Sequence, residues 1–194
     1  MQKIILATTS PYRQEAFRML DIDFEAVGSE VDETFVGRPN SPEELVTELS
    51  KRKAESVAAK YSDGIVIGFD SVGWFEGEVL EKPKNRKEAF QRLKKLSGNI
   101  HKFYTGVHLI NISENKIITS VAETEIKLRE LTEAEINKYL DQDEYYTTYA
   151  IGFDPLGHYS STFSESINGS YNNYLRGIPL ETIVGLLKEA KYEI

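Results

Sequence analysis

Residues 64–83 read GIVIGFDSVGWFEGEVLEKP, and this stretch decides the fold. It opens with a continuous apolar run from Gly64 to Phe69, which is typical of a strand covered on both faces of a sheet. Glu76-Gly77 then predicts a tight hairpin turn. A buried strand that leads into a hairpin indicates a mixed sheet, with both parallel and antiparallel pairing.

The hairpin predicts a register that brings an acid and an amine close together. With the turn at 76–77, Ser71 lies opposite Lys82, and Lys82 therefore lies one residue along the ladder from Asp70. Pro83 ends the pairing because it has no backbone N–H to donate. The alternative is a surface ion pair of little energetic value. The same register pairs Phe75 with Glu78, Trp74 with Val79, Gly73 with Leu80 and Val72 with Glu81.

Asp70 is the sharpest chemical feature of this stretch. We expect it to end the most apolar strand, and ligands gather outside the carboxyl ends of strands in α/β sheets. A buried carboxylate without a partner is unfavourable, so Asp70 requires a cation, a metal or a helix end. The alternative is a helix or turn cap, although no helical pattern follows.

Strands and helices alternate on both sides of this hairpin. Hairpins together with helical crossovers predict an α/β fold with a mixed sheet. Residues 141–173 are polar, aromatic and rich in glycine, and they resist assignment. Further strands are predicted at residues 3–7, 24–27, 101–112 and 116–128. Helices are predicted after the N-caps Ser10, Ser41, Asn85 and Thr132, and at residues 179–190.

Length and composition indicate one ordinary globular domain, residues 1–194. The chain has 194 residues, of which 40% are apolar and 28% charged. No apolar run approaches the roughly 20 residues of a membrane span. The apolar stretch at the N-terminus is too short for a signal peptide. The absence of cysteine excludes disulfides, a thiolate nucleophile and cysteine-ligated zinc. We therefore expect a cytoplasmic protein with no membrane contact.

The charge balance disfavours nucleic acid as a partner. The 23 basic and 31 acidic residues give a net charge of −8, which repels a phosphate backbone. A phosphorylated small molecule would need a local cationic pocket or a divalent metal.

Ser10-Pro11-Tyr12-Arg13 predicts an anion site. A helix that begins behind a strand presents free N–H groups and the positive end of its dipole. Arg13 lies in that first turn, where the dipole disfavours a cation, and it lies one turn before the inward Phe17. This placement favours a bound anion. The alternative is an arginine that extends to solvent.

Lys53 repeats this pattern on the second helix. It lies four residues from both Leu49 and Val57, at the edge of the apolar stripe, where a lysine usually has a partner. The alternative is a stem packed on the core with its amine in water.

Glu33 lies in an acidic loop that is not interpretable alone, because such loop pairs are usually solvated. His101, His108 and His158 lack metal-ligand spacing. The chain has neither a Walker motif nor a G-x-G-x-x-G motif, so kinase and NAD chemistry are disfavoured.

These positions resemble the Maf family of septum-formation-inhibitor-like nucleoside triphosphate pyrophosphatases, nearly end to end. LATTSPYR at 6–13 resembles the family's L-A-S-x-S-P-R-R, VDET at 31–34 its V-D-E, and KA at 53–54 its lysine-alanine pair. GFDSV at 68–72 resembles G-A-D-T-V, and EKP at 81–83 resembles G-K-P. LSGNIH at 96–101, TGV at 105–107 and GSY at 169–171 follow in the family's order. Each motif is short, but their joint order is specific.

The resemblance implies a two-lobed fold shared with the inosine triphosphatases, with the active site in the cleft between the lobes. It implies hydrolysis of a canonical or modified nucleoside triphosphate to the monophosphate and pyrophosphate with Mg²⁺ or Mn²⁺, and a homodimer. By the same resemblance, Ser10, Arg13, Lys53 and Lys82 would hold phosphates. Glu33 and Asp70 would bind the metal, and Asp70 would also activate the water.

The sequence departs from the family around the expected base site. Tyr12 replaces an arginine, YTT at 146–148 replaces an acidic-lysine-alanine-glycine run, and Gly152 replaces a glutamine. Arg176 is one extra residue before Gly177. These departures leave the nucleobase open. They also keep a rival reading, a non-catalytic nucleotide sensor or partner-binding protein in cell-division control.

Overall fold

The sheet is arranged about one long strand, β3 (Ile65–Phe75), in the computed structural model, which describes residues 2–193. The seven-stranded sheet has the order β2-β1-β3-β5-β6-β7, and β4 also pairs with β3. The other strands are β1 (Ile4–Ala7), β2 (Phe24–Ala26), β4 (Glu78–Leu80), β5 (Ile100–Asn111), β6 (Lys116–Leu128) and β7 (Ser164–Gly169). The helices are α1 (Pro11–Arg18), α2 (Pro42–Ala58), α3 (Arg86–Leu96), α4 (Glu133–Gln142), η1 (Tyr146–Thr148), η2 (Tyr159–Thr162), α5 (Tyr171–Arg176) and α6 (Leu180–Glu189).

The two edges of β3 are paired differently. One edge pairs with β5 along almost its whole length. The other edge pairs with β1 in parallel as far as Gly68, and with β4 in antiparallel from Gly73 onward. Within the described chain, no strand pairs with the residues between these two points. The edge of β3 is therefore open where Asp70 lies.

The strand assignment from sequence was correct in kind and wrong in length. Asp70 does not end the strand, because β3 runs on to Phe75 to pair with both β4 and β5. The hairpin register is confirmed for the pairs from Phe75 to Gly73. The ladder stops there, so Ser71 and Lys82 do not pair. Glu81 lies beyond β4 and accepts a hydrogen bond from Arg92 at its carbonyl oxygen instead.

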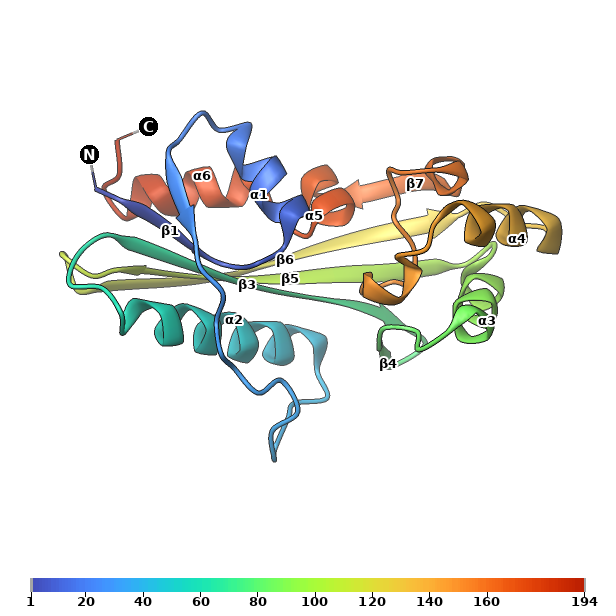
Figure 1. Ribbon diagram of the computed structural model, residues 1–194, viewed down its shortest axis with the longest axis horizontal. Coiled ribbons are helices and arrows are strands. Elements are labelled where there is room, and N and C mark those ends of the chain that lie inside the picture. Colours follow the sequence, from blue (N-terminus) through green and yellow to red (C-terminus); the bar gives the residue numbers. More distant parts are fainter. Residues whose placement is uncertain (1, 194) are drawn as a thin grey trace.

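Helices cover the two halves of the sheet differently (Figure 1). In the first half, α2 covers one face, while α1 and α6 cover the other around the buried Phe17 and Phe69. In the second half, α3, α4 and the 3₁₀ turns enclose a separate cluster around Tyr139, Phe153 and Phe163. The expected α/β fold with two lobes and a mixed sheet is thus confirmed. No helix between residues 2 and 193 is both long enough and apolar enough to cross a bilayer.

Helix α2 lies close to the sheet because glycines face it. A Cβ atom at Gly68 of β3 would overlap the carbonyl oxygen of Ser50, and one at Gly106 of β5 would overlap that of Val46. The backbone of α2 fills the space that side chains would need. This close approach brings Lys53 of α2 to β3.

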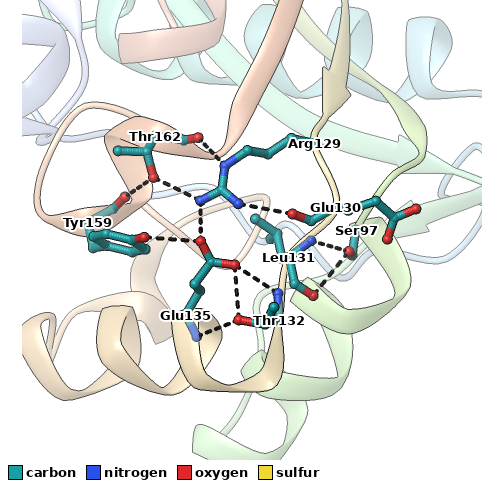
Figure 2. A network of polar contacts seen from close by, with 8 residues as sticks. All are labelled: Ser97, Arg129, Glu130, Leu131, Thr132, Glu135, Tyr159 and Thr162. Atoms are coloured by element: carbon teal, nitrogen blue, oxygen red, sulfur yellow. Dashed lines mark hydrogen bonds and ion pairs between the residues drawn. The ribbon is translucent and has the colours of Figure 1, made fainter.

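A polar network joins the end of β6 to α4 in the second lobe (Figure 2). Glu135 accepts hydrogen bonds from Arg129 Nη2 at 2.7 Å, from the backbone N–H of Thr132 at 2.9 Å and from the Tyr159 hydroxyl at 3.0 Å. Thr132 and Glu135 form a reciprocal capping box at the start of α4. The pKa of Glu135 is lowered to about 2. The hydrogen bond from Arg129 has the largest effect, and those from Thr132 have the next largest.

Glu135→Gln is expected to destabilise the protein at pH 7 but not in acid. Because the folded-state pKa lies below the unfolded-state value of about 4.5, the charged form contributes stability above that value. This contribution is lost as the pH falls towards 2. Melting curves of both proteins should therefore differ at pH 7 and converge as the pH falls towards 2.

Glu133→Gln is the matched control, because its ion pair with Lys94 is exposed on the first turn of the same helix. Its melting temperature should follow that of the wild type at every pH. A Glu135→Gln deficit that stayed constant with pH would contradict the assignment of the network's stability to this charge.

Candidate active site

A cavity of about 910 Å³ lies between the two lobes, beside the open edge of β3. The sequence-predicted site residues come from α1, α2, β3, the loop before α2 and the segment after β4. The structure brings all of them to the wall of this one cavity: Ser10, Arg13, Glu33, Lys53, Asp70 and Lys82.

The start of α1 faces this cavity because β1 ends beside it. Ser10 caps the helix, its Oγ accepting from the backbone N–H of Arg13 at 3.4 Å, and Pro11 occupies the first helical position. The helix thereby presents the positive end of its dipole to the cavity.

Arg13 is anchored inside the structure and does not extend to solvent. Its Nε donates to the carbonyl oxygen of Gly177 at 2.8 Å, and its Nη2 donates to Ser71 Oγ at 2.7 Å. Burial lowers the pKa of Arg13, and the charges of Asp70 and Glu33 oppose that shift. The two carboxylates thus favour the charged guanidinium, and its hydrogen bonds fix it beside the first turn of α1.

Lys53 links the two carboxylates of the site. Its Nζ lies 2.6 Å from Asp70 Oδ1 and 2.6 Å from Glu33 Oε1. The Lys53 side chain is only 13% exposed, so the alternative of an amine in water is wrong. Glu33, which the sequence alone could not interpret, is placed by this ammonium group.

The two carboxylates differ in their affinity for protons. Burial raises the pKa of Asp70 above its usual value, although the charges of Lys53 and Arg13 oppose this. Burial also acts to raise the pKa of Glu33, but Lys53, Lys82 and Arg13 outweigh it and hold that pKa below its usual value. The surroundings of Glu33 thus favour its ionised form, whereas burial makes Asp70 the better proton acceptor of the two.

Lys82 completes the charged part of the cavity. It follows β4, lines the cavity, and lowers the pKa of Glu33 through its charge. No ion pair joins it to a carboxylate in the described part of the chain. Its ammonium group therefore remains available to a ligand.

Two contacts that the sequence does not indicate hold the loop before α2 in place beside the cavity. Arg38 pairs with Glu81 at 2.7 Å, which joins that loop to the end of β4. Arg52 lies 3.5 Å from the centre of the Phe35 ring and holds the same loop against α2. These pairs join residues far apart in the chain, and nothing in the local sequence indicates them.

Three of the positions that depart from the family pattern line the cavity: Tyr12, Thr148 and Arg176. The hydroxyls of Tyr12 and Tyr149 lie 3.3 Å apart and bridge the two lobes. Arg176 also lines this wall, whereas Gly152 packs towards Pro83 outside it. Apolar side chains line the cavity as well: Val79, Leu80, Ile151 and Phe153. The cavity is therefore lined by aromatic and apolar side chains in addition to its charged groups.

The donor set fits a shared divalent cation. One oxygen of Glu33 and one of Asp70 each lie 2.6 Å from Lys53 Nζ, so the two carboxylates face a common point. Carboxylate oxygens are the ligands that Mg²⁺ and Mn²⁺ prefer. Between residues 2 and 193 no three histidine, aspartate or glutamate side chains are grouped to hold a metal. Two carboxylates suffice where substrate phosphates supply further ligands.

Comparison with known proteins assigns the family. A family model described as Maf-like protein matches residues 3–190. The chain belongs to the Maf-like family. Among curated Maf-like relatives, a Bacillus cereus protein named dTTP/UTP pyrophosphatase is 38% identical over 100% of this chain and 98% of its own length. A Bacillus anthracis protein of the same name is 37% identical over the same shares.

A solved structure supports the fold alone. The Ham1 protein of Staphylococcus aureus superposes with a TM-score of 0.56 at 17% identity, covering 97% of this chain and 100% of that one. The Maf-like chain thus shares its architecture with a Ham1 protein, as the family resemblance implied.

Proposed function

We propose that this Maf-like protein hydrolyses a nucleoside triphosphate to the nucleoside monophosphate and pyrophosphate. One observation carries the proposal: Arg13, Lys53 and Lys82 converge with Glu33 and Asp70 around the capped end of α1 in one cavity. Cations beside a helix N-terminus suit a polyphosphate, and the pair of unequal carboxylates suits hydrolysis. The activity named for the Bacillus relatives supports the same reaction.

The charged residues would position the triphosphate and stabilise the charge that develops as it is cleaved. Ser10, Arg13, Lys53 and Lys82 would hold phosphate oxygens. The water oxygen forms a bond to the α- or the β-phosphorus. The bond between that same phosphorus and the oxygen that bridges the two then breaks. Positioning and electrostatic stabilisation supply most of the acceleration in phosphoryl transfer.

Asp70 would take the proton of the attacking water. Its raised pKa makes it a better base for this step than an ordinary aspartate. Glu33 and Asp70 would hold Mg²⁺ or Mn²⁺, which supplies positive charge to the phosphates. Lys53, between both carboxylates, would keep them in place.

A nucleotide panel tests this function directly. Pyrophosphate release should be measured with dTTP, UTP, other canonical triphosphates and modified triphosphates, each with Mg²⁺ or Mn²⁺. We expect at least one triphosphate to yield equal amounts of monophosphate and pyrophosphate. A protein whose melting temperature rises with nucleotide, but which releases no pyrophosphate from any of them, would be the sensor of the rival reading. Homodimer assembly and cytoplasmic location stay predictions.

Lys82→Ala should weaken both substrate binding and turnover. Its ammonium group has no carboxylate partner among the described residues, so its charge is available to the phosphates in the ground state and the transition state. We expect KM to rise and kcat to fall, with kcat/KM reduced about 10- to 100-fold, the effect of one charged hydrogen bond.

Lys84→Ala is the comparison for Lys82→Ala. Lys84 also lines the cavity and is exposed, as Lys82 is, but its charge is not among those that lower the pKa of Glu33. Steady-state kinetics should show a much smaller change for this variant. Equal losses in both variants would assign the effect of Lys82 to general electrostatic attraction.

A further inference from the structure

Arg176 is a cation of the cavity wall that the mechanism above does not use. It ends α5, and its side chain is only 15% exposed. It lines the same cavity as Arg13 and Lys82. An arginine buried to this degree requires partners for its five N–H donors.

The contacts of Arg176 use few of those donors. Nη1 donates to the carbonyl oxygen of Leu175 at 3.2 Å. Nη1 also lies 3.5 Å from Asp154 Oδ1, which is too long for a charge-assisted hydrogen bond. That Asp154 oxygen already accepts from the backbone N–H of Leu156 at 3.0 Å. Within the described residues, the guanidinium therefore has donors left for a ligand.

Two neighbours place this guanidinium beside the start of α1. Its Cζ lies 5.6 Å from the centre of the Tyr12 ring, a favourable position for a cation, and Tyr12 is held by Tyr149. The residue after Arg176 is Gly177, whose carbonyl oxygen binds Arg13. Arg176 thus belongs to the wall that carries the anchored Arg13.

Two other cations of the cavity, Arg13 and Lys53, are more fully occupied. Arg13 donates to Gly177 and Ser71, and Lys53 lies between two carboxylates. A guanidinium with free donors matches phosphate oxygens in a two-pronged geometry. Tyr12 stands where the family pattern has an arginine, so a cation on α5 also restores the charge that position 12 lacks.

We propose that Arg176 is a further phosphate-binding residue. When the triphosphate binds, the guanidinium leaves Asp154 and donates to phosphate oxygens beside the first turn of α1. This inference rests on the proposed function, in which the cavity takes a nucleoside triphosphate. It also gives Asp154 a role, because its carboxylate competes with the phosphates for Arg176.

Inorganic tripolyphosphate tests the proposal because it has neither a sugar nor a base. Its affinity for the wild type and the variants should be measured by titration calorimetry. Arg176→Ala should weaken binding about 10- to 100-fold. The affinity of Arg176→Lys should lie between those of the wild type and Arg176→Ala, because lysine keeps the charge without the two-pronged guanidinium geometry.

Asp154→Asn should have the opposite effect. Asparagine keeps an Oδ1 acceptor for the N–H of Leu156 but removes the competing charge, so tripolyphosphate should bind several-fold more tightly. In the Arg176→Ala background this gain should disappear, because the two residues act through one contact. A gain that persisted in the double variant would contradict the competition between carboxylate and phosphate.

Arg18→Ala is the control, since it removes the same charge from an exposed position in α1 outside the cavity. Its affinity for tripolyphosphate should equal that of the wild type. If Arg176→Ala kept its affinity for tripolyphosphate but raised KM by amounts that differ between nucleobases, Arg176 would be assigned to base recognition and the proposal would be overturned. Should Arg176→Ala fail to fold, wild-type affinity in both Arg176→Lys and Asp154→Asn would overturn it as well.

Failure of the proposed function would look different. A wild-type protein that binds no tripolyphosphate and releases no pyrophosphate would overturn both inferences. A wild-type protein that releases pyrophosphate, together with an Arg176→Ala variant of unchanged affinity and kinetics, would overturn only the role of Arg176.

Discussion

Asp70→Asn is expected to lower kcat about 10²- to 10⁴-fold while the protein remains folded, which is the usual range for losing a group that transfers a proton. The substitution keeps the size of the side chain but removes the proton acceptor and one of the two carboxylates that face Lys53. Pyrophosphate release under saturating nucleotide measures the effect.

The stability of Asp70→Asn should not fall with its activity. Because burial raises the folded-state pKa of Asp70, the folded protein binds a proton that the unfolded chain has released between the unfolded and folded pKa values. The stability that this carboxyl contributes is present below the unfolded value and is lost as the pH rises through the folded value. At pH 7 we therefore expect the variant to melt no lower than the wild type.

Asp63→Asn makes the same chemical change at an exposed position outside the cavity, and its kcat should match that of the wild type. Melting curves and kinetics of the three proteins separate a chemical role from a structural one. An Asp70→Asn enzyme with wild-type turnover would overturn the assignment of the site.

Local chemistry in the sequence predicted much of the fold and part of the site. Ser10, Ser41, Asn85 and Thr132 all cap helices at the predicted positions, because a capping side chain bonds to backbone only three residues away. The hairpin register followed from a two-residue turn. Such features depend on neighbours in the chain.

Features that depend on distant pairing were not predictable in the same way. Glu33 takes its place from Lys53 on another element, and Arg176 of α5 meets Asp154 from the segment between η1 and η2. The extension of β3 past Asp70 depends on both of its neighbours. A single sequence shows each residue but not the partner that places it, so the family resemblance was needed to join them.

Gly68→Ala is expected to damage stability and activity together, because this glycine sets the distance between α2 and the sheet. A Cβ atom there would overlap the carbonyl oxygen of Ser50 and lie 2.7 Å from the backbone nitrogen of Ala54. Backbone atoms cannot move aside alone, so α2 as a whole must shift. Overpacking of this kind costs about 3 kcal/mol in the free energy of unfolding, which denaturant titration measures.

The same shift would separate the charged groups of the site. Lys53 precedes Ala54 in α2, and Asp70 lies two residues beyond Gly68 on the same face of β3. A displacement of about 1 Å in a positioning group can reduce turnover about 10²-fold. The Gly68→Ala protein that remains folded should therefore have a low kcat although every charged residue of the site is present.

Gly185→Ala is the matched control. Gly185 lies inside α6 with no atom within 4 Å of the added Cβ, so alanine should raise the free energy of unfolding by about 0.5–1 kcal/mol and leave kcat unchanged. Opposite effects of one substitution at two glycines would show that close packing at Gly68, rather than loss of a flexible residue, is what matters. If Gly68→Ala kept wild-type stability and turnover, α2 could move freely, and the distance from Lys53 to Asp70 would not be set by helix packing.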